Sequence, residues 1–274
     1  MSLFAFFLVM IAVVSHAVWN FIVKSSSDRL GAMVMMLLGI SIMGLVMLPF
    51  ATLPSDTYFW GLVALSALLH WAYNINILLA YRFSDLSLAY PIARGAVPII
   101  VLIAAYLVLG QLPSLQGIAG VTCVSLGIMA LAIFSHRIDP RGAGLAILTS
   151  FWIAGYTLVD GLGVRLENHA YAFVALIFAS HALIPLVTLI FVWRLRVPNS
   201  FVRAFPAAIL SVLAYAPVLW AQRTSDFAAV SALRETSVIV ASLLGVLILG
   251  EKQAGLRLGA AVLVCFGAVL VVAT

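Results

Sequence analysis

Three charged residues stand inside long apolar stretches of the sequence. Arg94 lies well within one stretch, and the neighbours Arg234 and Glu235 lie at a similar depth in another. A charge at the centre of a bilayer costs roughly 2.5–3.5 kcal/mol on insertion scales, so it should face a cavity or a partner. We expect the arginines to bind anionic groups of a substrate and Glu235 to be a candidate for proton or cation coupling. Structural ion pairs are the alternative.

Polar and aromatic residues recur every four positions in two other stretches: His16, Asn20 and Lys24, and then Trp152, Tyr156 and Asp160. Residues four apart share one face of a helix, and a polar face turned toward lipid would be costly. Both sets therefore predict cavity walls, with Asp160 as a second coupling candidate. For Lys24 and Asp160, which lie near the ends of their stretches, contact with lipid headgroups is the alternative.

Other apolar stretches add further aromatic, imidazole and amide groups to the predicted site. Walls of this kind suit an amphipathic organic solute and can hold a cation over the faces of their rings. His181 is isolated and is interpreted as a packing residue. The predicted substrate-binding residues are Trp19, Asn20, His70, Tyr73, Asn74, Tyr90, Arg94, Tyr156, Tyr215 and Arg234.

Several motifs for other chemistries are missing from the sequence. It contains no phosphate-binding GxxxxGK[ST] loop, no HExxH, no GxSxG and no Cys/His cluster with metal-ligand spacing. We therefore expect no catalytic residues, no cofactor and no metal site. Cys123 and Cys265 lie in separate apolar stretches and are predicted to be buried free thiols.

The elements that must position these residues are membrane helices. The chain is 65% hydrophobic and 8% charged, far from a soluble domain, and its mean hydropathy is +1.22. A spanning helix needs about 20 mainly apolar residues, and backbone groups in lipid must be paired within the segment. Ten such stretches predict an all-α integral membrane protein: 3–23, 30–53, 58–80, 86–109, 114–134, 142–163, 170–193, 203–221, 227–249 and 254–273. The first is interpreted as a membrane helix because no basic segment or cleavage site flanks it.

One stretch of the chain occurs twice. Residues 81–110 recur as 222–250, so that Arg94 corresponds to Arg234, 140 positions later. The repeat predicts two halves, 1–137 and 138–274, of five helices each. Because five crossings are an odd number, the halves are expected to be inverted, an architecture typical of secondary transporters with a site near the midplane.

The charge bias of the connections predicts the orientation. Apart from the intramembrane Arg94 and Arg234, ten of the remaining twelve Lys and Arg residues are assigned to odd-numbered connections, and only Arg165 and Arg223 to even-numbered ones. Positive-inside logic places the odd connections in the cytoplasm and both termini outside. Separately, small residues predict close helix packing in the scaffold or at a subunit contact: Gly117, Gly120, Gly127, Gly255 and Gly259.

With its two five-helix halves, the chain resembles the EamA type of the drug/metabolite transporter superfamily. The resemblance is carried by Trp19-Asn20 with Lys24, by 82–94, and by Ser225-Asp226 through Glu251. It implies an inner-membrane carrier of small metabolites, often an exporter of amino acids or related compounds, with a cavity lined by helices 1, 3, 4, 6, 8 and 9. The subgroup linked with phosphonate use is similar. Many members have both termini in the cytoplasm, opposite to the charge count.

Together, these features predict a secondary transporter of a small polar organic metabolite, such as an amino acid, that works by alternating access with a proton as candidate coupling ion. The expected partners are the substrate and the lipid bilayer, without nucleic acid, in a monomer or homodimer. A structural or regulatory membrane subunit and, less favoured, an intramembrane enzyme are the alternatives.

Overall fold

The computed structural model describes residues 1–26, 28–83, 86–133, 139–192, 201–240 and 254–273. Nearly all of these residues are helical, and no strand occurs among them. The elements are α1 (Leu3–Lys24), α2 (Arg29–Met47), η1 (Leu48–Phe50), α3 (Thr57–Phe83), α4 (Leu86–Gly95), α5 (Val97–Leu109), α6 (Leu115–Ile133), α7 (Pro140–Gly163), α8 (Ala170–Ser180), α9 (Leu183–Val187), η2 (Thr188–Val192), α10 (Phe201–Gln222), α11 (Phe227–Glu235) and α13 (Ala254–Val272).

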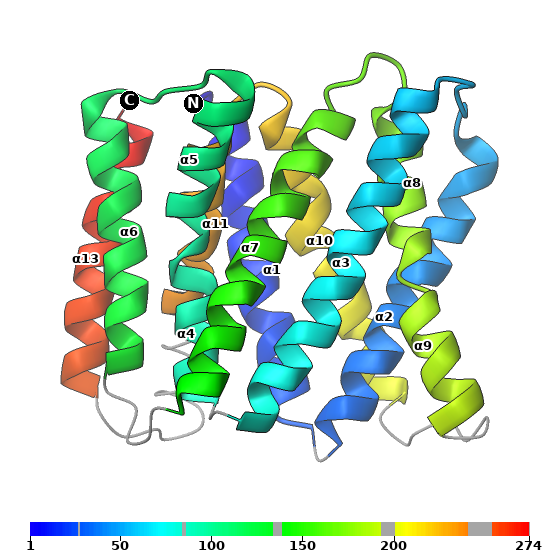
Figure 1. The fold of residues 1–274 in the computed structure, drawn as a ribbon, viewed down its shortest axis with the longest axis horizontal. Coiled ribbons are helices and arrows are strands. Elements are labelled where there is room, and N and C mark those ends of the chain that lie inside the picture. Colours follow the sequence, from blue (N-terminus) through cyan, green and yellow to red (C-terminus); the bar gives the residue numbers. More distant parts are fainter. Residues whose placement is uncertain (27, 84–85, 134–138, 193–200, 241–253, 274) are drawn as a thin grey trace.

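These helices run up and down one bundle, with both termini at the same end (Figure 1). In the described residues they form ten passes, if α4 is counted with α5, and α8 with α9 and η2. Six helices are long and apolar enough to cross a membrane, and two more are shorter and apolar. The predicted all-α membrane fold of ten helices is confirmed. The predicted boundary between the halves, at residues 137 and 138, lies outside the described residues.

The bundle is apolar outside and partly polar inside. Large side chains such as Phe50, Leu107 and Leu115 are exposed on its surface, whereas a set of polar side chains, among them His70 and Arg94, is buried within it.

 The charged side chains of that buried set are Arg94, Asp160, Arg234 and Glu235, each at most 4% exposed. An apolar exterior suits lipid, and charges held inside a membrane protein mark cavities and pathways.

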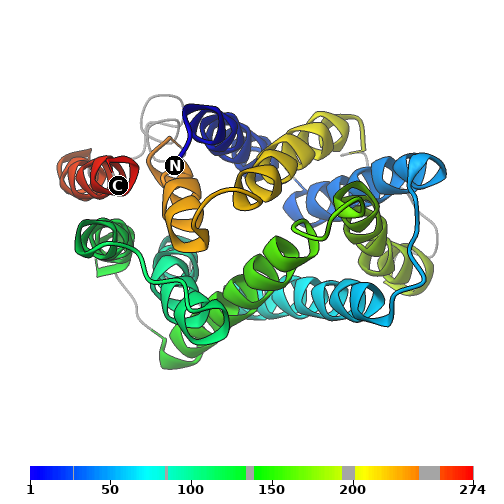
Figure 2. The same cartoon turned by 90° about the horizontal axis from the view of Figure 1, so that it is seen from above.

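Three pairs of helices make the most extensive contacts: α1 with α10, α3 with α7, and α6 with α13. Seen from above, α6 and α13 lie at one end of the bundle and α2 lies with α8 and α9 at the other (Figure 2). In the predicted repeat, α1 corresponds to α7 and α3 corresponds to α10. The α1–α10 pair is therefore the counterpart of the α3–α7 pair. The halves are therefore interlaced, because each of these pairs joins a helix before residue 137 to one after it. The division into inverted halves stays a prediction.

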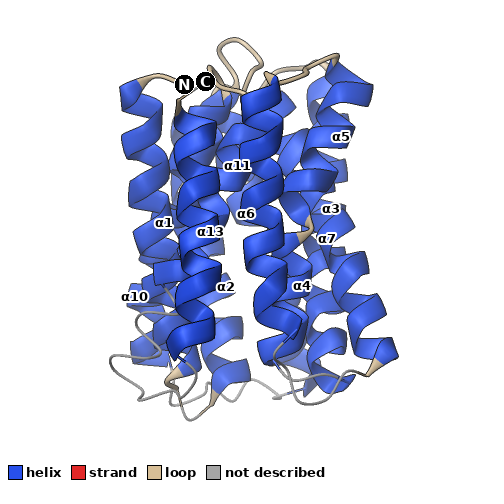
Figure 3. Cartoon of the chain, turned by 90° about the vertical axis from the view of Figure 1, so that its left-hand side faces the viewer, coloured by secondary structure: helices blue, strands red, loops and turns tan. Residues whose placement is uncertain are grey.

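The α6–α13 pair is close because it is built on small residues (Figure 3). A Cβ atom added to Gly120 would lie 2.7 Å from the carbonyl oxygen of Gly267, and one added to Gly267 would lie 2.7 Å from that of Gly120. Gly127 packs in the same way against Ala260 and Val264. Small residues at these positions let the backbones approach. By contrast, Gly259 has open space around it and does not take part in this contact.

The fourth predicted helix, 86–109, is broken. α4 ends at Gly95 and α5 begins at Val97, with Ala96 between them. The break has a chemical cause, because Pro98 has no N–H to donate to the carbonyl of Arg94. The second copy breaks at the corresponding residue, Thr236, where the hydroxyl donates to the carbonyl oxygen of Leu233 at 2.6 Å.

Both cysteines are free, as predicted, but neither is buried, so the prediction of buried thiols is wrong. Cys123 is partly exposed, and Cys265 is exposed on the outward face of α13.

Candidate substrate site

A cavity of about 100 Å³ lies inside the bundle, between α1, α2, α3, α4, α7, α8, α10 and α11. One part of its wall is charged, one part is aromatic, and one part is apolar. The lining residues are His16, Trp19, Met33, Met36, Leu37, Ile40, His70, Tyr73, Asn74, Arg94, Tyr156, Phe178, His181, Ser211, Ala214, Tyr215 and Arg234.

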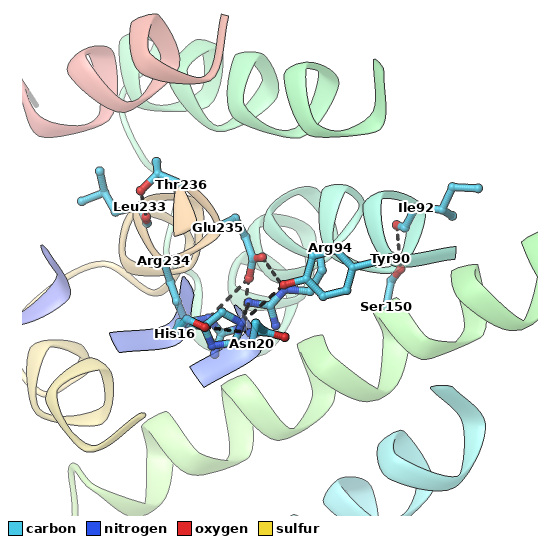
Figure 4. Close-up of polar contacts among 10 residues, drawn as sticks. All are labelled: His16, Asn20, Tyr90, Ile92, Arg94, Ser150, Leu233, Arg234, Glu235 and Thr236. Carbon is cyan, nitrogen blue, oxygen red and sulfur yellow. Dashed lines mark hydrogen bonds and ion pairs between the residues drawn. The ribbon is translucent and has the colours of Figure 1, made fainter. Parts of the chain in front are cut away.

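The two repeated arginines meet at this cavity through one carboxylate (Figure 4). Arg94 Nε lies 2.7 Å from Glu235 Oε2, and Arg234 Nη2 lies 3.2 Å from Glu235 Oε1. Glu235 is fully buried, and both arginines are at most 4% exposed. Among the described contacts, two cations therefore share one anion. One positive charge is left over, and both arginines face the cavity.

The breaks in the helices place the arginines. Arg94 lies in the last turn of α4, and Arg234 lies in the last turn of α11. A helix end that points into the interior of a membrane protein is tolerated where it lines a cavity, and discontinuous helices of this kind form the midplane sites of many secondary transporters. The same feature brings the two arginines to one carboxylate.

His16 and Tyr90 complete the charged cluster. His16 Nε2 lies 3.4 Å from both the Tyr90 hydroxyl oxygen and Arg94 Nη2. The Arg94 guanidinium carbon lies 6.0 Å from the centre of the Tyr90 ring, at the limit of a cation–π contact. The indole N–H of Trp19, which is beside His16, is buried and has no hydrogen-bond partner among the described residues. It is a donor that a solute in the cavity could use.

A second buried carboxylate, Asp160, lies behind the aromatic part of the wall. It accepts hydrogen bonds from the hydroxyl groups of Ser66 and Tyr215, and its Oδ2 lies 3.0 Å from His70 Nε2. His70 stacks on Tyr156, with ring centres 4.1 Å apart. Asp160 thus reaches the cavity through two of its lining residues, His70 and Tyr215. The alternative of a headgroup contact for Asp160 is wrong, because its side chain is fully buried.

Most of the predicted binding residues line this one cavity: Trp19, His70, Tyr73, Asn74, Arg94, Tyr156, Tyr215 and Arg234. Asn20 and Tyr90 do not. The Asn20 amide donates to the carbonyl oxygen of His16 at 2.8 Å, so it acts within α1. Tyr90 is not part of the cavity lining, but its hydroxyl group contacts His16, which is. Neither coupling candidate lines the cavity, since Glu235 and Asp160 each lie behind residues that do. The side chain of Lys24 lies outside the described residues.

The sequence did not reveal the apolar part of the wall. Met33, Met36, Leu37 and Ile40 of α2 and Phe178 of α8 line it, although the resemblance implied a cavity without helices 2 and 7. An apolar face toward a cavity has the same composition as one toward lipid, so only packing separates the two. His181, interpreted as a packing residue, also lines the cavity, with its ring centre 5.0 Å from that of His70. His16 lines the cavity, as its stripe predicts, although it is not among the predicted substrate-binding residues.

The described residues contain no group of three or more His, Cys, Asp or Glu side chains arranged to hold a metal ion.

Comparison with known proteins agrees with this architecture. Twenty-nine chains of known structure match, and one of them, a protein crystal structure without a functional name, has a TM-score of 0.75 at 16% identity. That match covers 98% of this chain and 97% of the other, and at this identity it shows the fold alone. No curated protein matches the sequence. The model of the EamA-like transporter family matches residues 140–273. These residues therefore form an EamA-like transporter family domain within a multi-pass membrane protein.

Proposed function

We propose that this protein is a secondary transporter that moves a small polar organic metabolite with an anionic group, such as an amino acid or a related compound, across the inner (plasma) membrane. The single observation that carries the proposal is the uncompensated positive charge of Arg94 and Arg234 at the cavity wall. A solute with one carboxylate would neutralise it, and charge-assisted hydrogen bonds to arginine are among the strongest available to a protein.

The rest of the wall favours a solute that is not only anionic. The aromatic rings of Tyr73, Tyr156 and Tyr215 surround the side nearest Asp160, where a cationic group would gain from the ring faces and from the carboxylate. The methionine side chains of α2 suit an apolar part, since their flexible thioethers adapt to different shapes. The volume of about 100 Å³ favours a small solute.

Alternating access is the mechanism that this arrangement favours. The site lies between helices of both predicted halves, next to the breaks in α4 and α11, so that rocking of one half against the other would change the side on which it opens. We propose Asp160, with His70, as the proton-coupling group. Glu235 is a weaker candidate, because both its oxygens are taken up by arginines.

The test begins with purified protein and a thermal-shift screen of amino acids, phosphonates, amines and nucleobases. The compound with the largest shift, called the probe compound below, is then followed as a radiolabel in sealed proteoliposomes. Wild-type protein should carry it across the membrane, and Arg94→Ala should reduce this flux to the level of empty liposomes while the protein still inserts. The matched control is Arg141→Ala, an exposed arginine at the start of α7.

Full flux in Arg94→Ala would remove Arg94 from the site. Chemical conversion of the probe compound in detergent, without a membrane to cross, would favour an enzyme. A protein that gives no shift with any compound and co-purifies with a partner would favour a structural or regulatory subunit.

A further inference from the structure

We propose that Glu235 is a built-in counterion that lets the carrier change sides while its cavity is empty. On this view, the carboxylate stands in for the anionic group of the substrate between transport cycles. The inference rests on the proposed transport function but concerns a different property: whether the protein can perform net transport or is restricted to exchanging one solute for another.

The geometry that carries the inference is the asymmetry between the two copies of the repeat. Each copy supplies an arginine at a helix break, but only the second has a carboxylate directly after it, since Gly95 occupies that position in the first. Glu235 reaches across to the first copy, 2.7 Å from Arg94, as well as to its neighbour Arg234 at 3.2 Å. It is completely buried and is not part of the cavity lining. It therefore faces the arginines from behind and leaves their cavity side free.

The charge count explains why this matters. Arg94, Arg234 and Glu235 together carry one net positive charge, whereas the two arginines alone would carry two. A carrier changes sides through a state in which its cavity is closed to water, and unpaired buried charges are then costly. A bound monoanion would neutralise the native cluster. Without substrate, Glu235 keeps the uncompensated charge at one, so the empty carrier can still return.

The inference predicts a specific defect. If Glu235 is neutral, the empty carrier holds two unpaired cations and becomes trapped facing one side. Movement would then require a bound anion, and the protein would become an obligate exchanger. Glu235 contacts the two arginines, and His16 contacts Arg94 and Tyr90, so the described contacts of this cluster include no second carboxylate.

The experiment needs no substrate. Ser211, which lines the cavity from α10, is changed to cysteine in a Cys123→Ala/Cys265→Ala background. A membrane-impermeant maleimide is then applied to either face of the membrane, with right-side-out and inside-out vesicles and with no solute added. With Glu235 present, the Ser211→Cys variant should be labelled from both faces. In Glu235→Gln, labelling from one face should fall at least about tenfold, which corresponds to 1.4 kcal/mol.

Two further variants separate charge from folding. Arg234→Gln/Glu235→Gln restores the native net charge of the cluster and should restore labelling from both faces. Glu235→Ala, purified in acetate, should lose labelling from one face when acetate is removed and regain it when acetate returns. The matched control is Glu167→Gln, an exposed carboxylate between α7 and α8, which should label as the parent does.

Labelling of Glu235→Gln from both faces would overturn the inference, and so would labelling of the parent from one face only. A lack of effect of acetate on Glu235→Ala would also contradict it. These outcomes are independent of the flux of the probe compound. The counterion role can therefore fail while the transport function stands, and the transport function can fail while the counterion role stands.

Discussion

At the scale of single residues, the site contains two buried carboxylates in different surroundings. Glu235 contacts two arginines, which are permanently charged. Asp160 contacts two hydroxyl groups and one imidazole, partners that can accept a change in its protonation. A carboxylate that binds and releases a proton during transport needs partners of the second kind.

Asp160→Asn should therefore uncouple transport from protons. The amide is nearly the same size, and its oxygen can still accept one of the two hydroxyl hydrogen bonds, which reach different oxygens of Asp160, but it cannot bind a proton at neutral pH. We expect the flux of the probe compound down its own gradient to persist, and the proton uptake that accompanies it to fall to background. The radiolabel measures the flux of the probe compound, and a pH-sensitive dye inside the proteoliposomes measures the proton uptake. The control is Asp56→Asn, at an exposed carboxylate. Unchanged proton uptake in Asp160→Asn would rule out Asp160 as the coupling group.

At the scale of elements, the breaks in the fourth and ninth passes decide where the arginines lie. The two breaks occur at corresponding residues, Ala96 and Thr236, but use different chemistry. In the first, Pro98 withholds a backbone donor from Arg94; in the second, the Thr236 hydroxyl bonds the carbonyl of Leu233. Agreement in position despite different residues indicates that the broken helix, rather than the proline, is the shared feature.

Pro98→Ala tests this role of the break. An alanine at position 98 supplies the missing N–H and favours a continuous helix through Ala96. We expect Arg94 to move relative to Glu235, and the affinity for the probe compound to fall by roughly tenfold, about 1.4 kcal/mol. Isothermal titration in detergent measures the affinity. Pro113→Ala, in the connection between α5 and α6, is the control, and an unchanged affinity in Pro98→Ala would show that the break does not position Arg94.

A further contact between elements closes the end of the bundle near α10 and α11. Arg165, between α7 and α8, donates to the carbonyl oxygens of Gln222 and Ser225 at 2.8 and 2.9 Å. Its guanidinium carbon lies 4.1 Å from the centre of the Phe227 ring. Burial lowers the pKa of Arg165, and the charge of Asp226 opposes this shift. One of the two arginines in the even-numbered connections thus has a structural role, so its position carries less weight as a charge signal.

At the scale of the whole molecule, ten passes place the two termini at the same end, as Figure 1 shows. Which side of the membrane this end faces depends on the charges of the connections. Arg165 and Arg223 belong to the even-numbered connections, between α7 and α8 and between α10 and α11, whereas the other Lys and Arg residues apart from Arg94 and Arg234 belong by sequence to odd-numbered ones. The positive-inside rule then predicts both termini outside.

Fusion of alkaline phosphatase or green fluorescent protein to either terminus tests this orientation. We expect the phosphatase fusions to be active and the fluorescent fusions to be dark, because phosphatase folds only outside the cytoplasm. The matched control is a fusion after residue 138, in an odd-numbered connection, which should behave in the opposite way. Bright fluorescence at the two termini would reverse the orientation and agree with that implied by the resemblance.

The sequence alone determined the fold class and named eight of the 17 residues that line the cavity. Apolar stretches of spanning length predict membrane helices because lipid leaves the backbone no other partner, and charges such as Arg94 and Arg234 predict a cavity because lipid excludes them. The tertiary structure decided the pairing: that Glu235 serves both arginines, that Asn20 bonds within its own helix, and that Met33 and Met36 face the cavity rather than lipid. These contacts depend on how helices that are distant in sequence rotate and pack against each other. The local sequence pattern around an apolar or a charged residue is the same whichever neighbour that residue contacts.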